Sequence, residues 1–295
     1  MAWTPLAAVL WALAYGAVRV WWAVRGAPSF GRLGIDLIAF KGWSAAGLCA
    51  AAAAVALAIR TARWRPPLLA AAWAVCAALL VACPLLLLDV VAGLLPGTGI
   101  PPHPVAFLSR AACLVECILL GAAAVAYRRR WRSACLFCGR TGKRVRLAQT
   151  PRWAWWAAYA AIAGWLLRLV AQVALGFDFL RRAPRAFLGF EAGFILAGTV
   201  LPLALVHPWG RRVPRWLPLG PAFAIGGGLT VYFGVGLVAI AAATLHATWR
   251  RDAGSPPLAF FWVAMPAYEM WGLGLLAAAV AYYQVTRPPC RVCGQ

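Results

Sequence analysis

Charge is scarce in this 295-residue chain, and acidic charge is scarcer than basic charge. Only 12% of the residues are charged, seven are acidic, and 64% are hydrophobic. The mean hydropathy is +0.79. A soluble domain of this size could not keep so much apolar surface out of water, so the composition excludes an ordinary soluble domain and indicates a lipid environment. The first hydrophobic segment also lacks the basic flank of a signal peptide, so we expect a membrane span there and not a cleaved leader.

Lysine is nearly missing, and the familiar catalytic motifs are missing altogether. Only Lys41 and Lys143 are lysines, whereas Ala, Gly, Pro and Trp are abundant, which suggests a bacterial genome of high G+C content and hence a bacterial plasma (inner) membrane. The chain contains no HEXXH, no Walker A loop and no GxSxG. No catalytic constellation is visible, so an enzyme is less expected than a transport or scaffold protein.

The charge that is present is mostly positive. The formal net charge is +21 and the pI is about 11.1, values that would indicate nucleic acid as a partner for a soluble protein. In a polytopic membrane protein, basic residues instead mark cytoplasmic loops and contacts with anionic phospholipid headgroups. We therefore expect the lipid bilayer and anionic headgroups as partners, with a cytosolic protein as a further candidate, and no nucleic acid.

Long hydrophobic runs dominate the rest of the chain. A helical span needs about 20 apolar residues, and eight stretches meet this requirement. They cover residues 3–24, 37–59, 67–90, 106–127, 153–176, 188–207, 218–247 and 259–285. The predicted fold is an all-α integral membrane bundle of eight helices.

Arginine and lysine also predict the orientation. With the N-terminus inside, the inner segments hold 17 basic residues and no acid, whereas the outer loops hold seven basic residues. The positive-inside rule then places both termini in the cytoplasm.

The two halves of the chain match each other. CxxCG recurs at an offset of 155, as do AAAVAY and a Pro-Pro pair. We predict a first four-helix unit over 1–139, a basic cytoplasmic linker over 140–152 and a second four-helix unit over 153–295, with parallel orientation. The alternative is a chance likeness among alanine-rich helices.

Two C-x-x-C-G knuckles carry the clearest chemistry. Their cysteines are Cys135, Cys138, Cys290 and Cys293. The pattern resembles the half-sites of zinc ribbons and rubredoxin-like knuckles, in which a two-residue spacer lets both thiolates reach one ion and the glycine relieves the tight turn. We expect one structural zinc ion that pins the two units together. Nearby basic residues would offset the negative charge of four thiolates, namely Arg140, Lys143, Arg144 and Arg291.

Three other interpretations of these cysteines stay open. An iron site would use the same four ligands, a redox dithiol would use one C-x-x-C pair, and the thiols could be unrelated. Cys49, Cys76, Cys83, Cys113 and Cys117 lie within predicted spans and are interpreted as small packing residues.

A few charges fall inside the predicted spans. A charge near the bilayer centre costs on the order of 3 kcal/mol or more, so it faces the protein interior and has a partner. We predict a polar site in the outer half of the membrane, lined by Arg19, Glu116, Arg168 and Glu269. Snorkelling of the two arginines to the headgroups, or a purely structural ion pair, are the alternatives.

The seventh predicted span is long and glycine-rich. It contains AIGGGLTVYFGVG at 224–236, so a break at Gly226–Gly228 could offer backbone groups to a ligand. Close helix packing through small residues explains the same pattern.

Two hypotheses on function follow. The first is a small-solute or ion transporter with its polar site in the outer half. The second is a membrane-embedded sensor or scaffold whose basic, zinc-bound cytoplasmic face engages a partner protein. A water-accessible cavity around Glu116 or Glu269 would favour the first.

Overall fold

The computed structural model is helical throughout the part of the chain that it describes. That part comprises residues 3–30, 36–63, 65–94, 103–135, 138–139, 149–174, 185–249, 256–288, 290 and 292–293, and it contains no strand. Contacts divide the chain into two compact units. Unit 1 comprises residues 1–90, 101–144 and 289–295, and unit 2 comprises residues 91–100 and 145–288.

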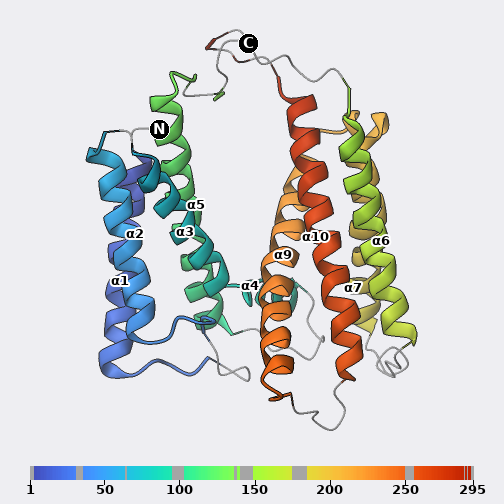
Figure 1. Cartoon of the computed structure of the whole chain (residues 1–295), viewed down its shortest axis with the longest axis horizontal. Helices are drawn as coiled ribbons and strands as arrows, with labels where there is room; N and C mark the ends of the chain where they lie inside the picture. Colours follow the sequence, from blue (N-terminus) through green and yellow to red (C-terminus); the bar gives the residue numbers. More distant parts are fainter. Residues whose placement is uncertain are drawn as a thin grey trace. The chain divides into compact units, whose positions relative to one another are not determined.

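Unit 1 is built from antiparallel apolar helices whose starts are set by proline. Its elements are α1 (Thr4–Arg25), α2 (Trp43–Thr61), α3 (Pro66–Ala82), the first part of α4 (Leu86–Leu94) and α5 (Pro104–Trp131). Proline occupies the first turn of α1, α3 and α5, where its missing N–H costs nothing. Helix α1 packs against α2 and α5, and α3 packs against α5 (Figure 1).

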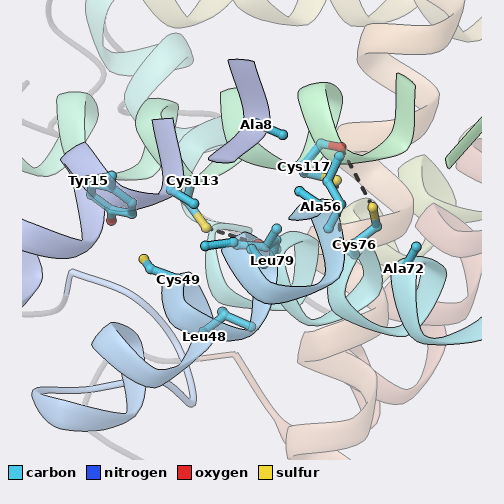
Figure 2. Packing of buried hydrophobic residues seen from close by; sticks show 14 of the residues in the cluster. Ala8, Tyr15, Leu48, Cys49, Ala56, Ala72, Cys76, Leu79, Cys113 and Cys117 are labelled. Carbon is cyan, nitrogen blue, oxygen red and sulfur yellow. Dashed lines mark hydrogen bonds between the residues drawn. The ribbon is translucent and has the colours of Figure 1, made fainter. Parts of the chain in front are cut away.

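The core of unit 1 consists mainly of alanine and cysteine. Small side chains allow α2, α3 and α5 to approach closely, and Figure 2 shows the cysteines between them. The thiols of Cys76 and Cys117 each contact the other residue's carbonyl oxygen, at 3.7 and 3.5 Å. The Cys113 thiol contacts the Leu79 carbonyl oxygen at 3.3 Å. These contacts agree with the interpretation of the span cysteines as packing residues.

Unit 2 is organised around its last helix. Its elements are α6 (Arg152–Ala174), α7 (Arg185–Ile195), a π-helical turn (Leu196–Val200), α8 (Leu201–Val206), a 3₁₀ turn (Pro208–Arg211), α9 (Trp216–Leu245) and α10 (Leu258–Thr286). Helix α10 packs against α6, α9 and α8 (Figure 1). The buried Trp271 lies on α10, within this packing.

Six of the eight predicted spans are helices long and apolar enough to cross a membrane. They are α1, α2, α5, α6, α9 and α10. The third predicted span consists of two helices, α3 and α4, with a bend of 47° between them. Counting this pair as one span gives seven candidate spans. In place of the sixth lies a shorter apolar helix, Glu191–Val206. Eight spans, the 4+4 repeat and the orientation therefore stay predictions.

The proposed break in the seventh span is wrong. Helix α9 runs without interruption from Trp216 to Leu245. A Cβ atom at Gly226 would lie 3.0 Å from the Gly272 carbonyl oxygen of α10. The glycine at this position therefore serves close packing of α9 on α10, and the backbone groups stay within the helix.

Candidate metal centre and buried ion pairs

The first cysteine knuckle forms where α5 ends. Cys135 and Cys138 follow the last turn of α5, and the Gly139 N–H donates a hydrogen bond to the Cys135 carbonyl oxygen at 2.6 Å. Gly139 has φ of 71°, a conformation that glycine adopts without steric cost. A Cβ atom there would also lie 2.8 Å from the Arg129 Nε atom. Both constraints explain why a glycine follows the second cysteine.

The two knuckles meet although their cysteines are 155 positions apart. The Sγ atoms of Cys135 and Cys290 lie 3.9 Å apart, and those of Cys138 and Cys293 lie 3.4 Å apart. All four sulfurs lie within 4.8 Å of one another. A tetrahedral shell with metal–sulfur bonds of about 2.3 Å places its sulfurs about 3.8 Å apart. The cysteines are therefore close enough to coordinate one metal ion.

Local hydrogen bonds favour the thiolate form of one ligand. The backbone N–H groups of Cys293 and Val292 contact the Cys290 sulfur and lower the pKa of this thiol to about 6. The Arg129 side chain adds positive charge beside Gly139, a counter-charge that sequence reasoning missed. The four basic residues expected in this role, Arg140, Lys143, Arg144 and Arg291, lie outside the described residues.

The geometry bears on which chemistry these cysteines can perform. The short sulfur–sulfur contacts join one cysteine of each knuckle, which is the arrangement of a single ion shared by both. Four protein ligands leave no open coordination position, as in structural and not catalytic sites. Sulfur ligands in this arrangement suit zinc or iron. All four cysteines belong to unit 1, so an ion here would hold the C-terminal tail against the loop that follows α5.

Buried ion pairs form a second group of polar residues in unit 1. Arg19 on α1 pairs with Asp36, and its Nη1 atom also donates to the Ser109 hydroxyl at 3.2 Å. Arg110 on α5 donates from Nη1 to Asp89 at 2.6 Å, and from Nε to the Asp36 carbonyl oxygen at 2.9 Å. Arg110 thus positions both acids at one end of the unit.

Unit 2 contains a corresponding pair. Arg168 on α6 makes two parallel hydrogen bonds to the Glu191 carboxylate, at 3.0 and 2.8 Å, and its Nε atom donates to the Tyr268 hydroxyl at 2.7 Å. The guanidinium carbon lies 5.4 Å from the centre of the Phe194 ring. Arg19 and Arg168 are only 5% and 4% exposed, so neither snorkels within the described structure.

Glu116 on α5 and Glu269 on α10 form no ion pair with the arginines among the described residues. Glu116 is fully buried, and neither of its carboxylate oxygens has a hydrogen-bond partner in the described part of the chain. The Oε1 atom of Glu269 is also buried and has no hydrogen-bond partner within the residues that the structure describes. A Cβ atom at Gly234 would lie 2.7 Å from it. The predicted set of four therefore separates into paired arginines and unpaired glutamates.

Unit 1 also contains a cavity of about 180 Å³. Its walls include Arg19, Trp22, Phe30, Asp36, Phe40 and Lys41. The cavity lies at the end of the unit where Arg19 contacts Ser109, near the start of α5, whereas the cysteine knuckle follows the end of this 28-residue helix. Of the four residues predicted to line an outer polar site, Arg19 lines this cavity, and Arg168, Glu116 and Glu269 do not.

Sequence reasoning missed the acids that pair with the arginines. The predicted polar site did not include Asp36, Asp89 or Glu191. A signal was available, because Asp36 and Glu191 are 155 positions apart, the same offset that relates the two cysteine knuckles. Matching acids at the repeat offset would have identified both partners.

The described residues define a helical protein with several membrane-length helices and a cysteine cluster close enough to coordinate a metal ion. Comparisons with protein-family models, curated proteins and solved structures found no match to this chain.

Proposed function

We propose that this chain is a multi-pass protein of the bacterial plasma membrane that binds a small polar solute from the outer side and carries it across the membrane. The observation that supports this proposal is the cavity of about 180 Å³, which has a buried guanidinium and a buried carboxylate in its walls. Buried charges within a membrane protein are costly and mark solute or ion pathways. The arginine bias of the loops favours an outer position for this cavity.

A transport assay with a mixed substrate pool tests the proposal and does not require the solute to be identified first. The full-length protein is reconstituted into liposomes and exposed to isotope-labelled sugars, amino acids, carboxylates, amines and inorganic ions. We expect at least one solute to accumulate, and Asp36→Asn to abolish its uptake. Arg130→Gln, an exposed change at the other end of α5, is the matched control. No accumulation of any solute by the wild-type protein would contradict transport.

We further propose that Cys135, Cys138, Cys290 and Cys293 hold one structural Zn²⁺ on the cytoplasmic side. Its role is to fix the C-terminal tail to the loop after α5. Four thiolates around Zn²⁺ leave a net charge of −2, which the adjacent Arg129 partly offsets. Because the pKa of Cys290 is lowered to about 6, this thiol is already largely deprotonated at neutral pH, which is the form that binds a metal ion.

Elemental analysis of purified protein tests the metal. We expect one zinc per chain in the wild type and loss of zinc in Cys135→Ser. Cys83→Ser is the matched control, because Cys83 is buried within unit 1 away from the knuckles. One iron per chain would identify the metal at this site as iron. Metal-free protein, or unchanged zinc in Cys135→Ser, would contradict a metal centre.

A sensor or scaffold is the second candidate function. It is favoured by Arg128, Arg130 and Arg132, which are exposed directly before the first knuckle and form a basic surface on that side. Such a surface suits an acidic protein partner or anionic headgroups. Charge reversal of all three arginines distinguishes the functions, because it would abolish partner capture by a scaffold but leave solute uptake by a transporter unchanged.

A further inference from the structure

The four knuckle cysteines differ in how far they are exposed to solvent. Cys293 is exposed and Cys138 is only 7% exposed, whereas Cys135 and Cys290 lie between these extremes. An oxidant that arrives from the solvent therefore meets Cys293 first. The sulfur of the buried Cys138 lies 3.4 Å from the Cys293 sulfur. An accessible cysteine beside a second, resolving cysteine is the arrangement found in redox sensors.

The short sulfur–sulfur contacts cross from one knuckle to the other. They join Cys138 to Cys293 at 3.4 Å and Cys135 to Cys290 at 3.9 Å. A disulfide bond is about 2.0 Å long, so the sulfurs of each pair need to approach by less than about 2 Å. Both contacts connect the loop after α5 with the C-terminal tail, the same two segments that one metal ion would connect. This pairing differs from a redox dithiol within a single C-x-x-C.

Oxidation would also change the charge of this surface. Four thiolates around one Zn²⁺ carry a net charge of −2, whereas two disulfides carry none. Arg128, Arg130 and Arg132 are exposed directly before the first knuckle. Conversion of the zinc site into two disulfides would therefore make the surface around these arginines more positive by two charges.

We propose that the four knuckle cysteines are an oxidation site, at which a hydroperoxide converts the thiolates into two disulfides that cross between the knuckles. Cys138–Cys293 forms first and Cys135–Cys290 second. This inference names the regulation of the metal site under the proposed function and rests on that proposal for the release of zinc. The formation of the disulfides does not require the metal.

The reaction proceeds in two substitutions for each pair. The Cys293 thiolate attacks one peroxide oxygen, the O–O bond breaks and hydroxide leaves, so that Cys293 becomes a sulfenic acid. The Cys138 thiolate then attacks the Cys293 sulfur, the S–S bond forms and a second hydroxide leaves. The two sulfurs lose two electrons and the peroxide gains them. A second peroxide oxidises Cys135 and Cys290 in the same way, and Zn²⁺ leaves because no thiolate remains to bind it.

Disulfide mapping of the full-length protein tests the inference. The protein in detergent is treated with increasing amounts of hydrogen peroxide, the remaining thiols are blocked with N-ethylmaleimide, and the peptides are identified by mass spectrometry. Cleavage after Phe137 and after Arg291 separates all four cysteines. We expect the Cys138–Cys293 link first and the Cys135–Cys290 link at higher peroxide, with zinc released to a coloured chelator. Links within one knuckle, or sulfonic acids without disulfides, would overturn the inference.

Two variants assign the roles of the cysteines. Cys138→Ser removes the resolving thiol, so Cys293 should stop at the sulfenic acid, which dimedone traps. Cys290→Ser should lose the second link and keep Cys138–Cys293. Cys83→Ser is the matched control and should form both links as the wild type does. If Cys138→Ser does not fold, Cys290→Ser decides the question, because absence of the Cys138–Cys293 link in that variant would overturn the pairing.

The outcomes separate this inference from the proposed zinc site. Links across the knuckles in protein that purifies without a metal would support the oxidation site and contradict the zinc centre. Zinc that stays bound at peroxide concentrations that oxidise other exposed thiols would support the zinc centre and overturn the oxidation site. Zinc release together with both links, reversed by dithiothreitol and added zinc, would support both.

Discussion

Units 1 and 2 both bury an arginine near the end of their first helix, but they enclose it differently. Arg19 lies in the wall of a cavity, whereas Arg168 is surrounded by the Glu191 carboxylate, the Tyr268 hydroxyl and aromatic rings. The Tyr268 ring in turn stacks on Phe233, with ring centres 3.8 Å apart. Arg19 Nε and Asp36 Oδ1 have no hydrogen-bond partner among the described residues, whereas each guanidinium nitrogen of Arg168 donates a hydrogen bond.

A second shared contact shows that the similarity extends beyond the arginines. The Tyr127 hydroxyl donates to the Arg63 carbonyl oxygen at 2.6 Å, and the Tyr282 hydroxyl donates to the Gly210 carbonyl oxygen at 2.8 Å. The two tyrosines are 155 positions apart and end the two AAAVAY segments. Tyr127 fixes the connection before α3, and Tyr282 fixes the connection before α9.

The comparison indicates how one arrangement can serve two purposes. A buried arginine needs an acid in either unit, because an unpaired buried charge is costly. Filling the surroundings with aromatic rings makes the pair a structural element, and leaving a cavity makes it a binding element. We therefore propose a structural role for the Arg168 pair and, under the proposed function, ligand binding for the Arg19 pair, a division that mutations in the two units can test.

The largest expected effect is the loss of the closed pair in unit 2. Glu191→Gln removes the charge that compensates Arg168 in an enclosed site, so we expect the free energy of unfolding to fall by about 3–5 kcal/mol. Asp36→Asn should cost only about 1–3 kcal/mol, because the adjoining cavity has room for water that can solvate the Arg19 charge once its partner is neutral. Unfolding by SDS in mixed micelles measures both values. Equal losses would contradict the division between a structural and a binding pair.

Helix packing should give the next largest difference. In unit 2, a Cβ atom at Gly164 of α6 would lie 2.5 Å from the Ala267 carbonyl oxygen and 2.7 Å from the Trp271 nitrogen of α10. We expect Gly164→Ala to destabilise the protein by about 1–3 kcal/mol through overpacking. The measurement is the shift in thermal unfolding of the detergent-solubilised protein.

Gly121→Ala is the matched control in unit 1. The nearest atom to a Cβ there is the Cys76 Sγ atom at 4.0 Å, an ordinary contact. Alanine also gains up to about 1 kcal/mol over glycine in a helix, so this variant should be neutral or slightly stabilising. A loss of stability as large as that of Gly164→Ala would show that α5 is packed as tightly as α6.

The tyrosine contacts predict a smaller difference. Tyr127→Phe should cost more than Tyr282→Phe, because the Tyr127 hydroxyl also accepts a hydrogen bond from the Arg65 N–H at 2.9 Å. We expect about 2 kcal/mol for Tyr127→Phe and about 1 kcal/mol for Tyr282→Phe. Thermal unfolding measures both, and identical losses would mean that the extra hydrogen bond contributes nothing.

Much of the helical architecture could be predicted from the sequence because a span depends on local composition. Six apolar runs of membrane length became single helices. The third is bent, and in place of the sixth lies the shorter apolar helix Glu191–Val206. The bend between α3 and α4 falls at Cys83 and Pro84, and proline removes a helical hydrogen bond. In the sixth, a π-helical turn contains Gly198, where a Cβ atom would lie 2.3 Å from the Trp165 ring.

The candidate sites also differ in how far the sequence predicts them. The spacing of Cys135 and Cys138 and its recurrence 155 positions later predicted the cluster of four cysteines, because knuckle geometry is local and the matching spacing identified the second pair. The partners of Arg19 and Arg168 were not predicted, since ion pairing depends on how loops fold back over helices. Depth along a helix suggested Glu116 and Glu269 instead, but depth alone does not determine which charges meet.

The smallest expected effects concern these two glutamates. A buried carboxyl group without a partner is most stable uncharged, because an isolated buried charge is expensive. Glutamine is uncharged and nearly the same shape, so Glu116→Gln should change the free energy of unfolding by less than about 1 kcal/mol. The expected change is similarly small for Glu269→Gln, because only the Oε1 atom of Glu269 is buried without a partner.

Uptake is then the discriminating measurement. If either glutamate carries a proton or cation, its glutamine variant should remain folded and lose accumulation of the solute against its gradient. If both variants keep full stability and full uptake, the glutamates are packing residues, and the polar site consists of the Arg19 cavity alone.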